Sequence, residues 1–136
     1  MSNFMLGSRS VRSLVGVHPD LLKIVRRALE ISSIDFSVIE GVRSPERQQR
    51  LYRSGATKTL HSRHLTGHAV DIVPWVMPHG IDWNNIMQFR QVGHAMKTAA
   101  AELGIRMEWG AKKTHGGDWN SFNDMPHYQL SRRDHP

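Results

Sequence analysis

An acidic residue, Asp71, lies inside the apolar run Ala69–Val73. Burying a lone carboxylate costs free energy unless it is paired with a cation or binds a metal ion. His64 precedes it across an expected turn, and a second histidine, His127, opens a later predicted strand. Two histidines and one carboxylate are a common ligand set for catalytic zinc, with the fourth position left for water. These residues therefore indicate a metal site.

The composition limits which residue types can hold a metal ion. The chain has 136 residues, no cysteine and a formal net charge of +6. Disulfides and thiolate metal sites are excluded, so any metal must be held by histidine or carboxylate. The positive charge favours polyanionic partners such as nucleic acid, lipid headgroups or carboxylate-rich wall peptides, and charge alone does not choose among them.

Hydrophobic periodicity and capping signals predict the elements that must position these residues. After a polar entry segment at Ser8–Leu14, we expect helices at Pro19–Ile31, from Pro45 to Gly55, and from a cap at Asp82 to Leu103. We expect strands at Asp35–Val42, Ala69–Val73, Ile105–Trp109 and Pro126–Leu130, and a Gly-rich loop at Lys112–Asn123. The predicted fold class is α+β: one domain over residues 1–136, with helices packed on a small, mostly antiparallel sheet that carries a zinc site.

The nearby histidines and tryptophans have alternative interpretations. His61, His64 and His68 could form a three-histidine face on a helix, but Gly67 and the β-branched neighbours disfavour a helix there. We therefore expect His61 and His68 to be solvated, near the site rather than in it. Trp109 and Trp119 could line a substrate groove or belong to the core, and the sequence leaves both alternatives open.

A two-part motif resembles a known family. The residues Ser62-x-His64-x-x-Gly67-x-Ala69-x-Asp71, followed by Asp124-x-x-His127, resemble the zinc metallopeptidase family of D-Ala-D-Ala carboxypeptidases and phage L-alanyl-D-glutamate endopeptidases. Upstream, Gly41-Val42-Arg43-Ser44 and Gln48 resemble the arginine-bearing turn and helix of that family. The segment from Gly16 to Phe36 resembles the N-terminal part of short phage endolysins.

The resemblance implies a role for each matching residue. It implies that Zn²⁺ is bound by His64, Asp71 and His127. It implies that the general acid and base is Asp124, that Arg43 steadies the oxyanion, and that Ser62 and Gln48 lie near the substrate. Many members carry glutamate where this chain has Asp124, which is one methylene shorter.

The function implied by the resemblance is that of a zinc-dependent peptidoglycan peptidase, a phage endolysin that cleaves the L-alanyl-D-glutamate bond of cell-wall stem peptides. We expect a monomer without a nucleic-acid partner. No apolar run approaches the roughly 20 residues of a membrane span, so we expect no stable membrane insertion. Met1–Gly16 has no apolar signal region, so we expect synthesis in the host cytoplasm and access to the wall after membrane permeabilisation.

Two other functions stay open at this point. A D-Ala-D-Ala carboxypeptidase would use the same motifs, which cannot separate it from an endopeptidase. A basic nucleic-acid-binding module would explain the net charge. It would not explain an acid in an apolar strand, and the basic residues are scattered without a recognisable nucleic-acid-binding motif.

Overall fold

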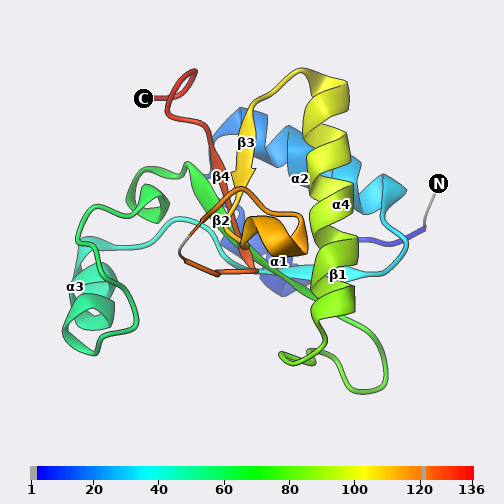
Figure 1. The fold of residues 1–136 in the computed structure, drawn as a ribbon, viewed down its shortest axis with the longest axis horizontal. Coiled ribbons are helices and arrows are strands. Elements are labelled where there is room, and N and C mark those ends of the chain that lie inside the picture. Colours follow the sequence, from blue (N-terminus) through cyan, green and yellow to red (C-terminus); the bar gives the residue numbers. More distant parts are fainter. Residues whose placement is uncertain (1–2, 121) are drawn as a thin grey trace.

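Four strands form one antiparallel sheet in the order β1-β2-β4-β3 (Figure 1). They are β1 (Phe36–Glu40), β2 (Ala69–Pro74), β3 (Met107–Trp109) and β4 (His127–Leu130). The computed structural model describes residues 3–120 and 122–136. Residues 1–2 belong to the N-terminal stretch in which we expected no signal, and residue 121 to the expected Gly-rich loop; both lie outside the described residues.

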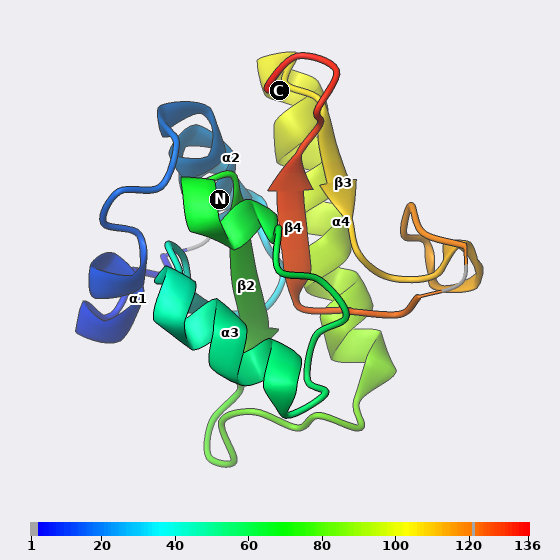
Figure 2. The same ribbon diagram turned by 90° about the vertical axis from the view of Figure 1, so that its left-hand side faces the viewer.

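The helices cover the sheet unequally. They are α1 (Ser8–Ser13), α2 (Pro19–Ile31), α3 (Pro45–Arg53) and α4 (Ile86–Leu103), with short 3₁₀ helices η1 (Arg63–Thr66) and η2 (Lys113–His115). Helices α2 and α4 pack against each other and against the sheet. In Figure 2, α3 lies in front of β2 whereas α4 lies behind β4. The predicted α+β class, with helices on a small antiparallel sheet, is confirmed.

Strand alternation gives the sheet an apolar face and a polar face, because successive side chains point to opposite sides. Val70 and Ile72 of β2 belong to the hydrophobic core with α2 and α4, and so do Tyr128 and Leu130 of β4. Asp71 lies between the two core residues of β2 and therefore points to the opposite face. One face of the sheet holds the core, and the other is left for polar side chains.

The predicted strands and helices lie within two residues of their observed ends, and larger differences occur at the polar entry segment and at the start of α4. The expected polar entry segment contains the six-residue helix α1, whose buried Ser10 accepts a hydrogen bond from the backbone N–H of Val38 in β1 (2.9 Å). Helix α4 begins at Ile86 and is capped by Asn85, not by Asp82. Asp82 instead accepts the backbone N–H of Asn84, which makes a turn just before the helix.

A β-bulge interrupts the pairing of β1 with β2. Val38 lies opposite Ile72, but the next residue in register with β2 is Glu40, opposite Asp71. Ile39 is therefore the extra residue of the bulge. In a regular strand that kept Ile39, Glu40 would share the core face of Val38, since residues two apart in a strand point the same way. The bulge turns the Glu40 carboxylate to the polar face.

None of the helices within residues 3–120 and 122–136 combines the length and the apolar character that a membrane span requires.

Candidate active site

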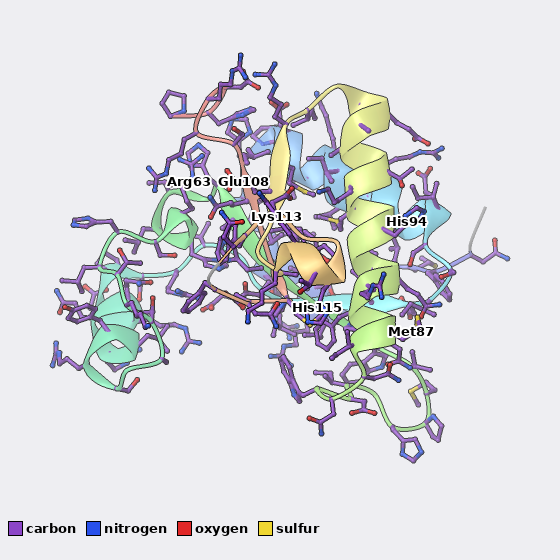
Figure 3. All side chains as sticks on the ribbon, viewed as in Figure 1. Arg63, Met87, His94, Glu108, Lys113 and His115 are labelled. Carbon is purple, nitrogen blue, oxygen red and sulfur yellow. The ribbon has the colours of Figure 1, made fainter. Side chains whose placement is uncertain are left out.

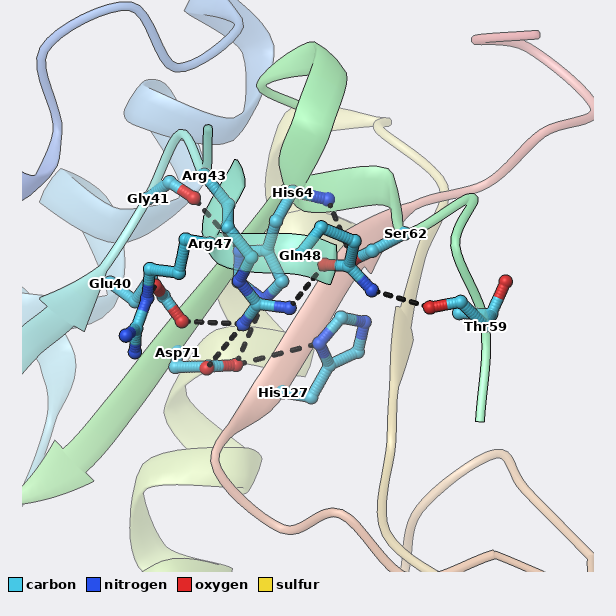
Figure 4. Close-up of polar contacts among 10 residues, drawn as sticks. All are labelled: Glu40, Gly41, Arg43, Arg47, Gln48, Thr59, Ser62, His64, Asp71 and His127. Atoms are coloured by element: carbon cyan, nitrogen blue, oxygen red, sulfur yellow. Dashed lines mark hydrogen bonds and ion pairs between the residues drawn. The ribbon is translucent and has the colours of Figure 1, made fainter. Parts of the chain in front are cut away.

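The centre of the polar face is built from two paired strands and one 3₁₀ helix (Figure 4). Asp71 of β2 lies directly opposite His127 of β4 in the strand register, which brings their side chains close together. The Asp71 Oδ1 atom is 3.4 Å from His127 Nδ1 and 3.2 Å from His64 Nε2. His64 comes from η1 and is 2% exposed. The structure thus brings together the three predicted metal ligands.

Both histidines are oriented by an acceptor on the outer side of the ring. His64 Nδ1–H donates to the carbonyl of Gly41 (2.8 Å), and His127 Nε2–H donates to Gln129 Oε1 (2.8 Å). In the neutral rings these bonds leave the lone pairs of His64 Nε2 and His127 Nδ1 facing the Asp71 carboxylate. Three converging lone pairs require a cation between them, which is either a ring proton or a metal ion.

The spacing of these atoms fits a metal ion. Ligands about 2.0–2.2 Å from a tetrahedral zinc ion lie roughly 3.3–3.6 Å from one another. The ligand atoms of His64, Asp71 and His127 lie within 4.8 Å of one another, and the two histidine–carboxylate distances are 3.2 and 3.4 Å. Outer acceptors on both rings are the usual support of metal-binding histidines. The donor set and its surroundings therefore fit zinc.

The charges of this centre are strongly coupled. Burial by itself would raise the pKa of Asp71, but hydrogen bonds from His127 and His64 and their charges outweigh it and hold that pKa well below its usual range. Burial disfavours the charged form of His127, but the Asp71 carboxylate raises the pKa of His127 above its usual value. The carboxylate thus stays ionised at neutral pH, which is the form that binds a metal.

Two glycines are required for the observed position of His64. Gly67 ends η1 with a φ of +76°, and a Cβ there would lie 2.7 Å from the carbonyl oxygen of Gly16. Gly41, whose carbonyl orients the His64 ring, lies so close to the end of α1 that a Cβ would meet the Ser13 carbonyl oxygen at 1.9 Å. Only glycine allows these two approaches.

An arginine lies beside the carboxylate of the centre. Arg43 Nη2 is 3.8 Å from Asp71 Oδ2 and also pairs with Glu40, while Arg43 Nη1 donates to Gln48 Oε1 (2.9 Å). Burial would raise the pKa of Glu40, but its hydrogen bonds with Arg43 and Arg47 lower it. The guanidinium is therefore held in one position next to the candidate metal ligands.

The two residues expected near the substrate have different surroundings. Gln48 is 1% exposed, and its amide donates to the Thr59 carbonyl (2.6 Å) as well as accepting from Arg43. It lies behind Arg43 and connects α3 to the segment before η1. Ser62 lines the pocket and accepts the backbone N–H of His64 (3.2 Å) at the start of η1. Both side chains thus contribute to the position of other site residues.

The centre opens into a cavity of about 560 Å³. Asp124 lines it together with the three candidate ligands, and the carboxylate is partly buried. Burial raises the pKa of Asp124, and the charge of Asp71 raises it further against the opposing charges of His127, His64 and Arg43. Asp124 is thus a carboxylate of raised proton affinity beside the centre.

The aromatic residues and the flanking histidines occupy distinct places. Trp109 is 2% exposed and stacks on Tyr128 in the core, whereas Trp119 lines the cavity with its ring 5.3 Å from that of His127. His61 is exposed at the cavity wall. His68 does not line the cavity.

Sequence reasoning missed the groups that orient the ligands. Gln129 could have been found, because it lies two residues after His127 and therefore on the same face of a predicted strand. Gly41 acts through its main-chain carbonyl, which no side-chain pattern reveals. Glu40 reaches the site only because of the bulge in β1.

Comparisons with known proteins agree with this fold. The family model for phage L-alanyl-D-glutamate peptidases matches residues 1–131. The L-alanyl-D-glutamate peptidase of Escherichia phage T5 is 35% identical over 133 residues, which are 96% of this chain and 91% of that protein. The crystal structure of the Serratia marcescens L-Ala D-Glu endopeptidase ChiX is 47% identical, with a TM-score of 0.82 over 95% of this chain and 91% of that one.

A more distant structure shares only the fold. The vancomycin resistance D,D-dipeptidase VanXYg, solved with a D-Ala-D-Ala phosphinate analogue, is 15% identical with a TM-score of 0.54. The match covers 84% of this chain and 50% of that one.

Fold and relatives together define an enzyme of the peptidase class. The chain belongs to the family of phage L-alanyl-D-glutamate peptidases. The predicted resemblance and the predicted enzyme class are confirmed. The roles assigned to single residues and the identity of the metal stay predictions.

Proposed function

We propose that this chain hydrolyses the L-alanyl-D-glutamate amide of peptidoglycan stem peptides and that it uses zinc bound by His64, Asp71 and His127. The observation that carries the proposal is the position of Asp71 Oδ1, 3.2 Å from His64 Nε2 and 3.4 Å from His127 Nδ1, with the outer nitrogen of each ring bonded to an acceptor. Family membership supports the bond that is cut.

The residues around the centre supply the remaining chemistry. When bound, zinc supplies a Lewis acid that lowers the pKa of water and polarises an amide carbonyl. Asp124 accepts the proton of the attacking water and passes it to the leaving amine, and its raised pKa suits a group that must both take and return a proton. Arg43 contributes fixed positive charge near the developing oxyanion.

Arg43 is held in place by two partners and still has donors to offer. Its Nη1 donates to Gln48 and its Nη2 pairs with Glu40, and the Nε–H is buried without a hydrogen-bond partner among the described residues. The same partners restrict the motion of the guanidinium, and a charge that is already in place costs no reorganisation during the reaction.

The cavity wall suits an acidic substrate. Arg47, Lys58 and Arg132 line the same cavity as the three candidate ligands. The amine side of the scissile bond belongs to a glutamyl residue, which keeps a free carboxylate whichever of its carboxyl groups continues the peptide. Cationic side chains on the cavity wall can attract that carboxylate and orient the stem peptide.

The test is digestion of purified peptidoglycan followed by mass spectrometry. We expect new amino-terminal glutamate on the stem peptides, intact glycan strands, loss of activity with a strong chelator and recovery with zinc. Release of terminal D-alanine alone would instead support a carboxypeptidase. New reducing sugar ends, or full activity of a verified metal-free preparation, would contradict the proposed chemistry.

A further inference from the structure

A second group of metal-binding side chains lies where α2 begins and the chain approaches its C-terminal end. His18 caps α2 and Asp20 belongs to the first turn of that helix, whereas His135 follows β4. Each residue offers one ligand atom, and these atoms all lie within 4.8 Å of one another. None of the three lines the cavity of the candidate active site, so this group is separate from it.

A third imidazole stands next to this group. The ring of His18 is 5.0 Å from that of His135, edge to face, and 5.4 Å from that of His68. Imidazole nitrogen suits zinc, copper and nickel, whereas calcium and magnesium prefer oxygen ligands.

The contacts within the group leave one nitrogen unsatisfied. His135 Nε2 bonds to Asp20 Oδ2 (2.8 Å), and His18 Nδ1 accepts the backbone N–H of Asp20 (3.0 Å). The other ring nitrogen of His135, Nδ1, is buried and has no hydrogen-bond partner within the described part of the chain. A buried polar atom without a partner is unfavourable, and a bound ion is one way to satisfy a ring nitrogen.

We propose that His18, Asp20 and His135 form a second site, with a structural role, for a divalent transition-metal ion of the zinc class. Asp20 and His135 are 115 positions apart in the sequence. A bound ion would therefore connect the start of α2 to the C-terminal segment. Binding would replace the hydrogen bond between His135 and Asp20 with bonds to the ion.

The group is connected to the segment that carries His64. The backbone N–H of His18 donates to the carbonyl of Gly67 at the end of η1 (2.9 Å). The buried Arg63, the first residue of η1, donates to the carbonyls of His135 and Leu130. Arg63 is labelled in Figure 3, next to the sheet. An ion at the second site would therefore also stabilise the position of η1, which carries His64.

Zinc binding to the whole chain and to matched variants tests the site. Equilibrium dialysis against rising zinc, with metal analysis, gives ions bound per chain at saturation. We expect His135→Gln and His135→Ala each to bind one ion fewer than the unmodified chain. The glutamine variant keeps an amide that can donate to Asp20, so it preserves the fold. His94→Ala is the control, since His94 is exposed on α4 (Figure 3) and should not change the number.

Thermal denaturation supplies a readout that does not depend on the first site. A His64→Ala chain lacks one ligand of the active centre, yet zinc should still raise its Tm and calcium should not. The further change His135→Gln should remove that rise. Equal zinc content at saturation in the unmodified chain and both His135 variants would overturn the proposal. So would a His64→Ala chain whose Tm does not respond to zinc. Neither result bears on the peptidase activity.

Discussion

The two histidines of the active centre differ in what orients them. His64 donates to a main-chain carbonyl, that of Gly41, whereas His127 donates to a side chain, that of Gln129. A substitution can therefore remove the acceptor of His127 directly. The acceptor of His64 can be disturbed only by moving the backbone.

We predict that Gln129→Leu weakens zinc binding at the active centre by roughly 10- to 100-fold, because His127 Nε2–H loses its acceptor while the side chain keeps a similar volume. Gln129→Glu keeps an acceptor and should bind zinc at least as tightly as the unmodified chain. Competition with a chromophoric chelator measures both affinities. Unchanged affinity in the folded leucine variant would show that Gln129 does not support the metal.

Variants of Asp124 and Asp71 distinguish a proton acceptor from a metal ligand. Asp124→Asn should keep its zinc and its fold but lose roughly 10²- to 10⁴-fold in rate, the usual range for general acid–base catalysis. Asp71→Asn should lose zinc as well as activity, since a neutral amide is a poor zinc ligand. Zinc per chain and wall-lysis rate are measured for each variant. Near-normal lysis by Asp124→Asn would remove Asp124 from the mechanism.

At the scale of elements, η1 depends on the sharp turn at Gly67. Gly104, which ends α4, has a similar positive φ of +68°, but a Cβ there would meet nothing within 4 Å. We predict that Gly104→Ala lowers the free energy of unfolding by about 1–2 kcal/mol through backbone strain alone. Gly67→Ala should lower it by roughly 1 kcal/mol more, because its Cβ also meets the Gly16 carbonyl oxygen.

Equilibrium urea unfolding gives both values, and zinc content reports whether His64 keeps its place. Equal losses for the two glycine variants would show that the contact with Gly16 is relieved without cost.

Elements with strong periodicity were predictable, and those that depend on distant contacts were not. Helix α2 was predicted with its observed bounds, since Pro19 and an apolar stripe define it. Helix α1 has only six residues, five of them polar, and it forms beside β1, so no local sequence pattern predicts it. The three candidate ligands were predicted from their types and spacing. That Asp71 faces His127 follows from a strand register that no local sequence signal specifies.

For the whole molecule, the net charge of +6 should act on binding to the wall rather than on the chemical step. We predict that the lysis rate of intact wall sacculi falls steeply as salt rises from about 0.05 to 0.5 M, because screening shortens the range of attraction to about 10 Å or less. Hydrolysis of a short soluble stem peptide should fall much less. A turbidity assay measures the lysis of sacculi, and a chromatographic assay measures the hydrolysis of the soluble peptide. Equal salt dependence of the two rates would indicate that charge acts only within the cavity.

The bulge at Ile39 determines which way the acid of β1 points. A regular strand with the same number of residues would return Glu40 to the core face, where it could no longer pair with Arg43. Removing Ile39 would instead place Glu40 directly after Val38, on the polar face and still opposite Asp71. Relatives that carry an acid here should therefore either keep the bulge or lack one residue, since both arrangements present the acid to the arginine.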